Sequence, residues 1–166
     1  MTFVRQIPRM LQDEHRATIA VLERLESILA RAKPNSPPPS SNELNSALGD
    51  LSTAIEGEIG SHFAFEEQEL FSRLRETGDH MIAELLTAEH EIILSLGRDV
   101  ASLARQAKNA GFSEDSWRLF YPQGYELIER MVAHIQKEEM ALLPIVDELL
   151  DEEQDEMLAM EYAGQR

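Results

Sequence analysis

Two stretches of the chain carry a histidine followed four residues later by a glutamate: His62 with Glu66, and His134 with Glu138. Residues four apart in an α-helix lie on one face, so each stretch would present an imidazole beside a carboxylate. Both groups are common transition-metal ligands, and each pair could form half of a metal site. With His15 and His90 from two further helices, the sequence predicts two metal ions held by six side chains.

Four long helices are expected to position these side chains. Helix-forming residues such as Ala, Leu and Glu dominate, and no run of alternating β-branched residues indicates strands. The expected helices cover about residues 8–31, 41–76, 79–109 and 113 onwards. Ser40 and Glu43 fit a capping box that opens the second helix, and Asp79 fits an N-cap for the third.

Apolar residues recur every three or four positions along each helix, and the candidate ligands fall in register with them. The clearest stripe belongs to the last long helix: Leu127, Met131, His134, Glu138, Leu142 and Ile145. Pro122 is expected to kink or restart this helix. Pro144 is expected to distort it one turn beyond Glu138, because the proline ring opposes the carbonyl of Met140.

The connections complete the expected organisation. A single domain spans residues 1–166, with a bundle core over about residues 8–149. The proline-rich segment 33–41 cannot continue a helix and is expected to be an exposed loop. The acidic residues 151–166 would form a short terminal helix or a frayed tail. The predicted fold is therefore all-α, an up-down-up-down four-helix bundle with a short acidic C-terminal helix or tail.

The candidate ligands are expected to share one layer of this bundle. At about 1.5 Å of rise per residue, their distances from the helix ends agree to within about a turn in antiparallel helices. Four imidazoles and two carboxylates in an apolar core would cost several kcal/mol unless they were paired or bound to metal. With no thiolate, this donor set suits iron best, with manganese and zinc as alternatives. Each glutamate could bridge two ions and leave open coordination.

Composition excludes several classes of protein. The net charge of −16, from 31 acidic and 15 basic residues, disfavours nucleic-acid binding and anionic lipid. Cysteine is absent, which excludes disulfides, thiolate metal sites and cysteine nucleophiles. Residues 1–9 show no apolar segment followed by a cleavage site, and no stretch could cross a bilayer. We expect a cytoplasmic protein.

The ordered set of motifs resembles the hemerythrin-like family, also called the HHE cation-binding domain, over about residues 12–146. The matching pieces are Asp-Glu-His-Arg at 13–16, the segment 62–71, Ala-Glu-His at 88–90 and the segment 134–144. The resemblance implies a non-haem di-iron centre with Glu66 and Glu138 bridging. The terminal ligands it implies are His15, His62, His90 and His134.

One feature departs from the oxygen-carrying members of that family, which have two histidines four apart on the third helix. Here the positions four before and four after His90 are Leu86 and Leu94. The set of four histidines and two glutamates is more similar to the branch that repairs damaged iron centres. That branch usually carries a cysteine-containing N-terminal domain, whereas these 166 residues contain no cysteine, so the assignment within the family stays open.

The leading hypothesis is a di-iron protein that binds, senses or processes a small diatomic ligand, O₂ or NO. The alternatives are iron storage, delivery or repair, and a di-iron oxidoreductase, for which no proton donor or catalytic residue stands out. The expected partners are the diatomic ligand and a redox protein, with no nucleic acid or membrane, in a monomer or homodimer. We interpret the glutamates beside the candidate ligands as surface residues or partners of the ligands: Glu14, Glu67, Glu89 and Glu139.

Overall fold

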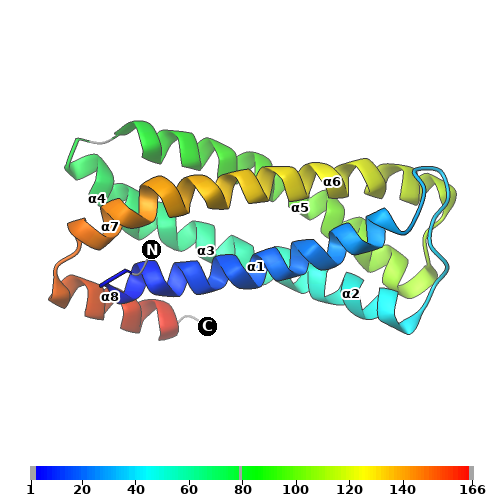
Figure 1. Cartoon of the computed structure of the whole chain (residues 1–166), viewed down its shortest axis with the longest axis horizontal. Coiled ribbons are helices and arrows are strands. Elements are labelled where there is room, and N and C mark those ends of the chain that lie inside the picture. The colour runs from blue at the N-terminus through cyan, green and yellow to red at the C-terminus, as the bar shows by residue number, and fades with distance from the viewer. Residues whose placement is uncertain (1–2, 79, 165–166) are drawn as a thin grey trace.

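The computed structural model describes residues 3–78 and 80–164, and its long helices run alternately up and down in a bundle (Figure 1). The first is α1 (Gln6–Ala30) and the third is α5 (His80–Ala110). The second is a continuous run of α2 (Asn42–Thr53), η1 (Ala54–Ile59), α3 (Gly60–Phe65), η2 (Glu66–Leu70) and α4 (Phe71–Glu76). The fourth joins α6 (Glu114–Lys137), η3 (Glu138–Leu142) and α7 (Leu143–Leu149), and α8 (Glu152–Gly164) follows. The predicted all-α, up-down-up-down bundle is confirmed.

Short polar residues and glycine set the helix ends. The Ser41 hydroxyl accepts the backbone N–H of Leu44 at 3.1 Å, so α2 is capped one residue later than the predicted Ser40. The difference arises because Ser40 and Ser41 are chemically equivalent caps, and the loop geometry selects between them. Gly111 has φ of 75° and ends α5, where its left-handed conformation needs no Cβ. Asp79, the predicted cap of the third helix, lies outside the described residues.

The two prolines of the last long helix behave differently. The helix α6 is continuous through Pro122, so the predicted restart there is wrong. Pro122 lies on the exposed face, while Trp117 and Phe120 are fully buried before it and anchor that part of the helix. The distortion predicted near Pro144 is confirmed, because the π-helical turn η3 lies just before it.

A polar layer divides the core into two apolar clusters. One contains Leu22, Leu48, Ile55, Val100, Trp117 and Leu127 with their neighbours. The other contains Ile7, Leu11, Phe71, Leu86, Leu143 and Leu158 with theirs. Between the two clusters lie the six buried candidate ligands: His15, His62, Glu66, His90, His134 and Glu138. The bundle thus supplies a dry scaffold on both sides of the polar layer.

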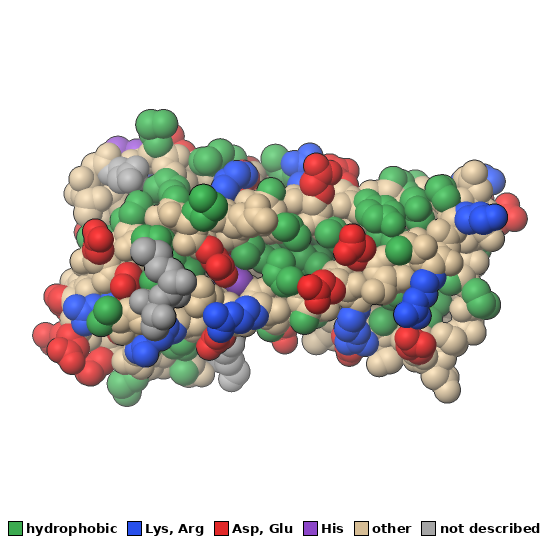
Figure 2. Space-filling model, in the orientation of Figure 1, with side chains coloured by type: hydrophobic (Ala, Val, Ile, Leu, Met, Phe, Trp, Pro, Cys, Tyr) green, Lys and Arg blue, Asp and Glu red, His purple; other side chains and the backbone are tan. Residues whose placement is uncertain are grey.

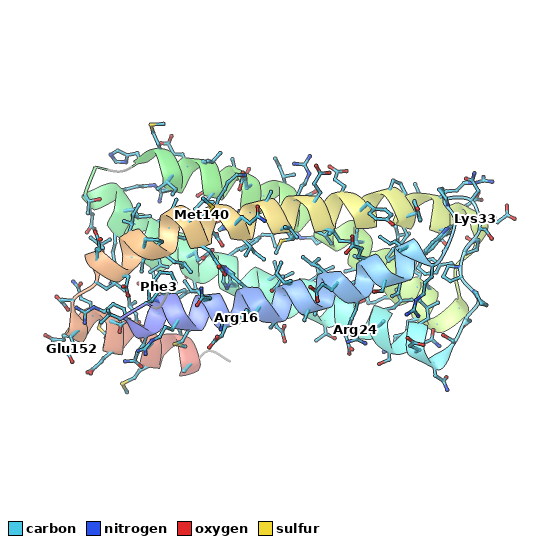
Figure 3. The ribbon with its side chains drawn as sticks, in the orientation of Figure 1. Phe3, Arg16, Arg24, Lys33, Met140 and Glu152 are labelled. Atoms are coloured by element: carbon cyan, nitrogen blue, oxygen red, sulfur yellow. The ribbon has the colours of Figure 1, made fainter. Side chains whose placement is uncertain are left out.

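The predicted acidic tail forms the helix α8, which packs beside the start of α1 (Figure 1). Asp155 accepts the backbone N–H groups of Gln6 at 2.7 Å and Ile7 at 2.9 Å. These are among the N–H groups that the first turn of a helix leaves without partners. Phe3 lies next to this junction and belongs to the same apolar cluster as Tyr162 (Figure 3). The C-terminal helix therefore contributes to the apolar cluster that contains Ile7 and Leu158.

The surface carries acidic and basic side chains interspersed along the helices, with acidic side chains gathered at the end that α8 occupies (Figure 2). Among the described residues, no helix combines the length and apolar character needed to cross a membrane.

Candidate metal centre

The four long helices each bring candidate ligands to the same level of the bundle. His15 comes from α1, His62 from α3 and His90 from α5, while His134 lies near the end of α6. Glu66 and Glu138 are the first residues of the π-helical turns η2 and η3. None of the six side chains belongs to a residue more than 6 % exposed.

The π-helical turns change which residues face the core after each glutamate. Leu70 and Phe71 are consecutive, and both are at most 1 % exposed; Leu142 and Leu143 are also consecutive, and both are fully buried. The wider π turn helps to direct both neighbours inward, although adjacent residues are also buried together in regular α-helix, as at Val100 and Ala101. Each π turn thus begins at a glutamate of the polar layer and is followed at once by two buried apolar residues. Single π turns of this kind are frequent at functional sites.

The two glutamates lie in the middle of the layer, between two pairs of histidines. Glu138 has its Oε2 atom 3.0 Å from Nε2 of His15 and its Oε1 atom 2.8 Å from Nε2 of His134. Glu66 has its Oε1 atom 3.2 Å from Nε2 of His62 and its Oε2 atom 3.4 Å from Nε2 of His90. Each carboxylate thus spans from one histidine pair to the other.

The histidines pair through atoms that would serve as metal ligands. The Nε2 atoms of His15 and His62 lie 3.3 Å apart, and those of His90 and His134 lie 3.1 Å apart. The potential ligand atoms form two groups, and within each group all of these atoms lie within 4.8 Å of one another. One contains His15, His62, Glu66 and Glu138; the other contains Glu66, His90, His134 and Glu138. Two sites that share both glutamates are the arrangement expected for a pair of metal ions with bridging carboxylates.

The carboxylate oxygens provide a test of fit. All four side-chain oxygens of Glu66 and Glu138 are buried, and among the described residues none accepts a well-aligned hydrogen bond, although histidine Nε2 atoms lie 2.8–3.4 Å away. A buried carboxylate without donors costs several kcal/mol, and a bound cation would remove that cost. The donor set therefore fits two transition-metal ions. That these particular atoms hold the ions stays a prediction.

A ring of four further carboxylates surrounds the histidines and contacts each at its Nδ1 atom. Glu14 lies 2.6 Å from His62, Glu67 lies 2.8 Å from His90, Glu89 lies 2.9 Å from His134, and Glu139 lies 3.3 Å from His15. An Nδ1–H group that donates to a carboxylate leaves the Nε2 lone pair directed at the metal and fixes the ring orientation. The structure thus places these four glutamates as partners of the ligands.

The ring runs around the bundle in one direction, from α1 to α3, from η2 to α5, from α5 to α6 and from η3 back to α1. Each of its glutamates is adjacent in sequence to a candidate ligand on its own helix. Neighbours in a helix point about 100° apart, so a residue beside an inward ligand faces the adjoining helix. The sequence signal was therefore the acidic residue next to each ligand, but the sequence did not indicate which histidine each glutamate contacts.

The electrostatics of the layer favour positive charge. Burial opposes protonation of His62, but the nearby carboxylates, led by Glu66 and Glu14, raise its pKa to about 10. Burial likewise opposes protonation of His90, while Glu138 and Glu66 raise its pKa to about 9. Burial favours the neutral form of Glu138, but the surrounding histidines, led by His134, hold its pKa well below the usual range. Cations that displaced the imidazole protons would be stabilised by the same carboxylates.

The family model of the hemerythrin HHE cation binding domain matches residues 6–146. The chain belongs to the hemerythrin family. Comparison with curated proteins gave no match. The predicted family resemblance is confirmed, and the matched range contains all six candidate ligands. Membership of the family implies metal-ion binding.

The two sides of this hemerythrin site differ in access. On the side of His90, the ring of Phe63 stacks on the imidazole with centroids 3.8 Å apart and planes 7° apart, and Phe71 stacks at 5.6 Å. On the side of His15 and His62, a pocket of about 160 Å³ adjoins the layer. Its apolar lining includes Ala17, Ile59, Phe63, Met131 and Ile135. An external ligand therefore has space beside the ion position of His15 and His62.

Proposed function

We propose that this hemerythrin-family chain is a non-haem di-iron protein that binds, senses or processes a small diatomic molecule, O₂ or NO. The observation that carries the proposal is the pocket beside the His15 and His62 pair, because it joins a donor set for two ions to a small chamber. A site designed only for structure would be closed and four-coordinate.

The donor chemistry supports iron. Each ion position is surrounded by two imidazoles and by oxygens of the two shared carboxylates, without thiolates. Nitrogen and oxygen donors of this kind suit iron, and manganese or zinc could substitute. A di-iron pair would supply one-electron redox chemistry and open coordination positions when bound. The residues of the chain hold the ligands in place and exclude bulk water.

The size of the pocket supports a diatomic ligand. Sites for organic molecules usually enclose about 300–1,000 Å³, whereas the pocket beside His15 and His62 encloses about 160 Å³. Ile59, Met131 and Ile135 give the pocket an apolar part that suits an uncharged molecule, beside the polar side chains of Glu14, Thr18 and Glu58. This size argues against an oxidoreductase that acts on a large organic substrate at the same position.

The ring of glutamates supports a permanent centre over an iron store or delivery protein. Each imidazole is held at Nδ1 by a carboxylate from a neighbouring helix, and such partners typically raise metal affinity about 10–100-fold. Storage or delivery instead requires easy release. Loss of metal under mild chelation would favour that second candidate function.

The remaining expectations concern the setting of the protein. We propose a redox partner protein, a cytoplasmic location and a monomer or homodimer. Cell fractionation and sedimentation of the metal-loaded protein would check the location and the oligomeric state.

The deciding experiment is elemental analysis of protein purified without chelators or added metal, combined with absorption spectra in air and after reduction. We expect about two irons per chain from the two donor groups, and near-ultraviolet bands that reductant bleaches. Titration with O₂ and NO would then identify the ligand. Stoichiometric zinc without a redox-active spectrum would contradict the redox role, and well-folded protein without any metal would refute the proposal.

A further inference from the structure

The C-terminal helix α8 lies outside the part of the chain that matches the hemerythrin family, yet it reaches the metal layer. The family match ends at residue 146, and α8 spans Glu152–Gly164. Asp155 anchors the start of α8 by accepting the backbone N–H groups of Gln6 and Ile7. Tyr162 lies seven residues, or about two helical turns, beyond Asp155 and so faces the same side.

Tyr162 is buried, with 1 % of its surface exposed, and its hydroxyl points into the ring of glutamates. The Tyr162 hydroxyl donates a hydrogen bond to Oε2 of Glu14 at 2.7 Å. The same oxygen lies 2.6 Å from Nδ1 of His62, which donates to it. A chain of two hydrogen bonds therefore joins α8 to a candidate metal ligand.

The aromatic ring of Tyr162 is held independently of its hydroxyl. It stacks on Phe65 with centroids 4.1 Å apart and planes 26° apart. Phe65 directly precedes the candidate ligand Glu66. Because the stack needs only the ring, a phenylalanine at position 162 would keep the packing and lose the hydrogen bond to Glu14.

The hydrogen bond between Tyr162 and Glu14 lies on the same side of the candidate metal centre as the pocket. Glu14, His15 and His62 all line the pocket of about 160 Å³. His90 and His134, on the other side, have their Nδ1 atoms against Glu67 and Glu89 instead. Any influence of Tyr162 should therefore reach one ion more than the other.

We propose that Tyr162 is a positioning residue that fixes Glu14, and through it the imidazole of His62, so that α8 tunes the ion on the pocket side. This inference rests on the proposed di-iron function. A Glu14 carboxylate held by two donors has one preferred orientation, and His62 then keeps its Nε2 atom directed at the ion. Without the hydroxyl, Glu14 can rotate and the imidazole loses part of its orientation.

The test compares Tyr162→Phe with the wild type and with Tyr125→Phe, all loaded with ferrous iron. Tyr125 lies on α6 beside Tyr121, nine residues before His134, and serves as the matched control. Each protein is mixed with a colorimetric iron chelator, and the release of the two ions is followed over time. Glu14→Gln, which removes the charge that contacts His62, serves as the positive control.

For Tyr162→Phe, one of the two ions should leave about threefold to tenfold faster and the other at the wild-type rate, because the hydroxyl acts one hydrogen bond further from the ion than the direct partners of metal ligands, whose loss costs about 10–100-fold. Glu14→Gln should accelerate the same ion by about 10–100-fold. The Tyr125→Phe control should release both ions at the wild-type rates. The absorption bands of Tyr162→Phe should shift as well, which a purely structural role for the hydroxyl would not produce.

Two results would overturn the inference while leaving the proposed function intact. One is an unchanged release profile in Tyr162→Phe, and the other is equal acceleration of both ions, which indicates general loosening of the bundle. If the wild type holds no iron, the proposed function fails. The same release measurement with cobalt(II), whose visible bands report its ligands, then decides the role of Tyr162 separately.

Discussion

Replacing Glu138 with glutamine is expected to remove both metal ions, whereas replacing His15 with alanine is expected to remove one. Glu138 belongs to both groups of ligand atoms, and its oxygens lie 3.0 Å from His15 and 2.8 Å from His134. His15 belongs to one group. Glutamine keeps the shape of the side chain but loses the charge that lets a carboxylate bridge two cations. The stoichiometry should therefore fall from two ions to none in one variant and to one in the other.

The stability effect follows from the number of ions lost. At a free metal concentration about 100-fold above the dissociation constant, each ion stabilises the folded state by about 2.7 kcal/mol. For a chain of this length, 1 kcal/mol shifts the Tm by about 2–4 °C. The gain in Tm on adding metal should therefore be about 10–20 °C in the wild type, about half of that in His15→Ala and about zero in Glu138→Gln.

The assay measures metal per chain and thermal melting for each protein, with metal and after chelation. The difference between the two melts cancels any change in packing that a substitution causes in both forms. Glu129→Gln, an exposed change on α6, is the control and should behave as the wild type. The reasoning fails if Glu138→Gln retains one ion, or if His15→Ala loses both while keeping its fold, because the two sites would then not share Glu138 as the geometry requires.

Three other predictions follow from the pocket, the histidines and α8. Thr18→Phe places a larger side chain in the pocket beside His15 and His62 and should slow the binding of azide or NO at least several-fold, with the iron content unchanged. Binding rates measured by stopped flow that equal those of the wild type would contradict the proposed access route. In the chelated protein, the pKa values of His62 and His90 are raised to about 10 and about 9. The stability that their protonated forms contribute is complete below about pH 6.5 and is lost as pH rises through 9 and 10, so the Tm should fall over that range. A Tm that does not change with pH would contradict this electrostatic contribution. Asp155→Asn weakens the side-chain cap at the start of α1 and should lower the free energy of unfolding by about 1–2 kcal/mol. The Tm should fall by about 2–8 °C without a change in metal content. Loss of metal at an unchanged Tm would show that Asp155 supports the metal centre and not the stability of the helix end.

Much of the site could be predicted because its ligands follow a local rule. A spacing of four residues puts His62 with Glu66, and His134 with Glu138, on one helical face, whatever the helix packs against. The choice between a step of three and a step of four was wrong at one position beyond Glu138. Ile145 was expected on the apolar stripe, yet it is only half-buried and Val146 is buried instead. A step of three from Leu142 leads to Ile145 and a step of four leads to Val146, and the pattern of apolar residues did not distinguish the two.

Other features depend on how the helices rotate against one another. The glutamates beside the ligands could be recognised as acidic neighbours, but the pairing of Glu14 with His62 requires knowing which helix adjoins which and at what rotation. The continuity of α6 through Pro122 likewise depends on the burial of Trp117 and Phe120, which outweighs the local preference of proline.

The sequence by itself determined the class of fold, the family and the six candidate ligands, because helical periodicity and residue chemistry are properties of short segments. Only the tertiary structure decided which side of the centre is open, because Phe63 covers His90 from another helix while the pocket adjoins His15. The tertiary structure also decided that the acidic C-terminal helix docks on α1 and brings Tyr162 to Glu14. Contacts between residues 148 positions apart depend on the packing of whole helices, which no local pattern encodes.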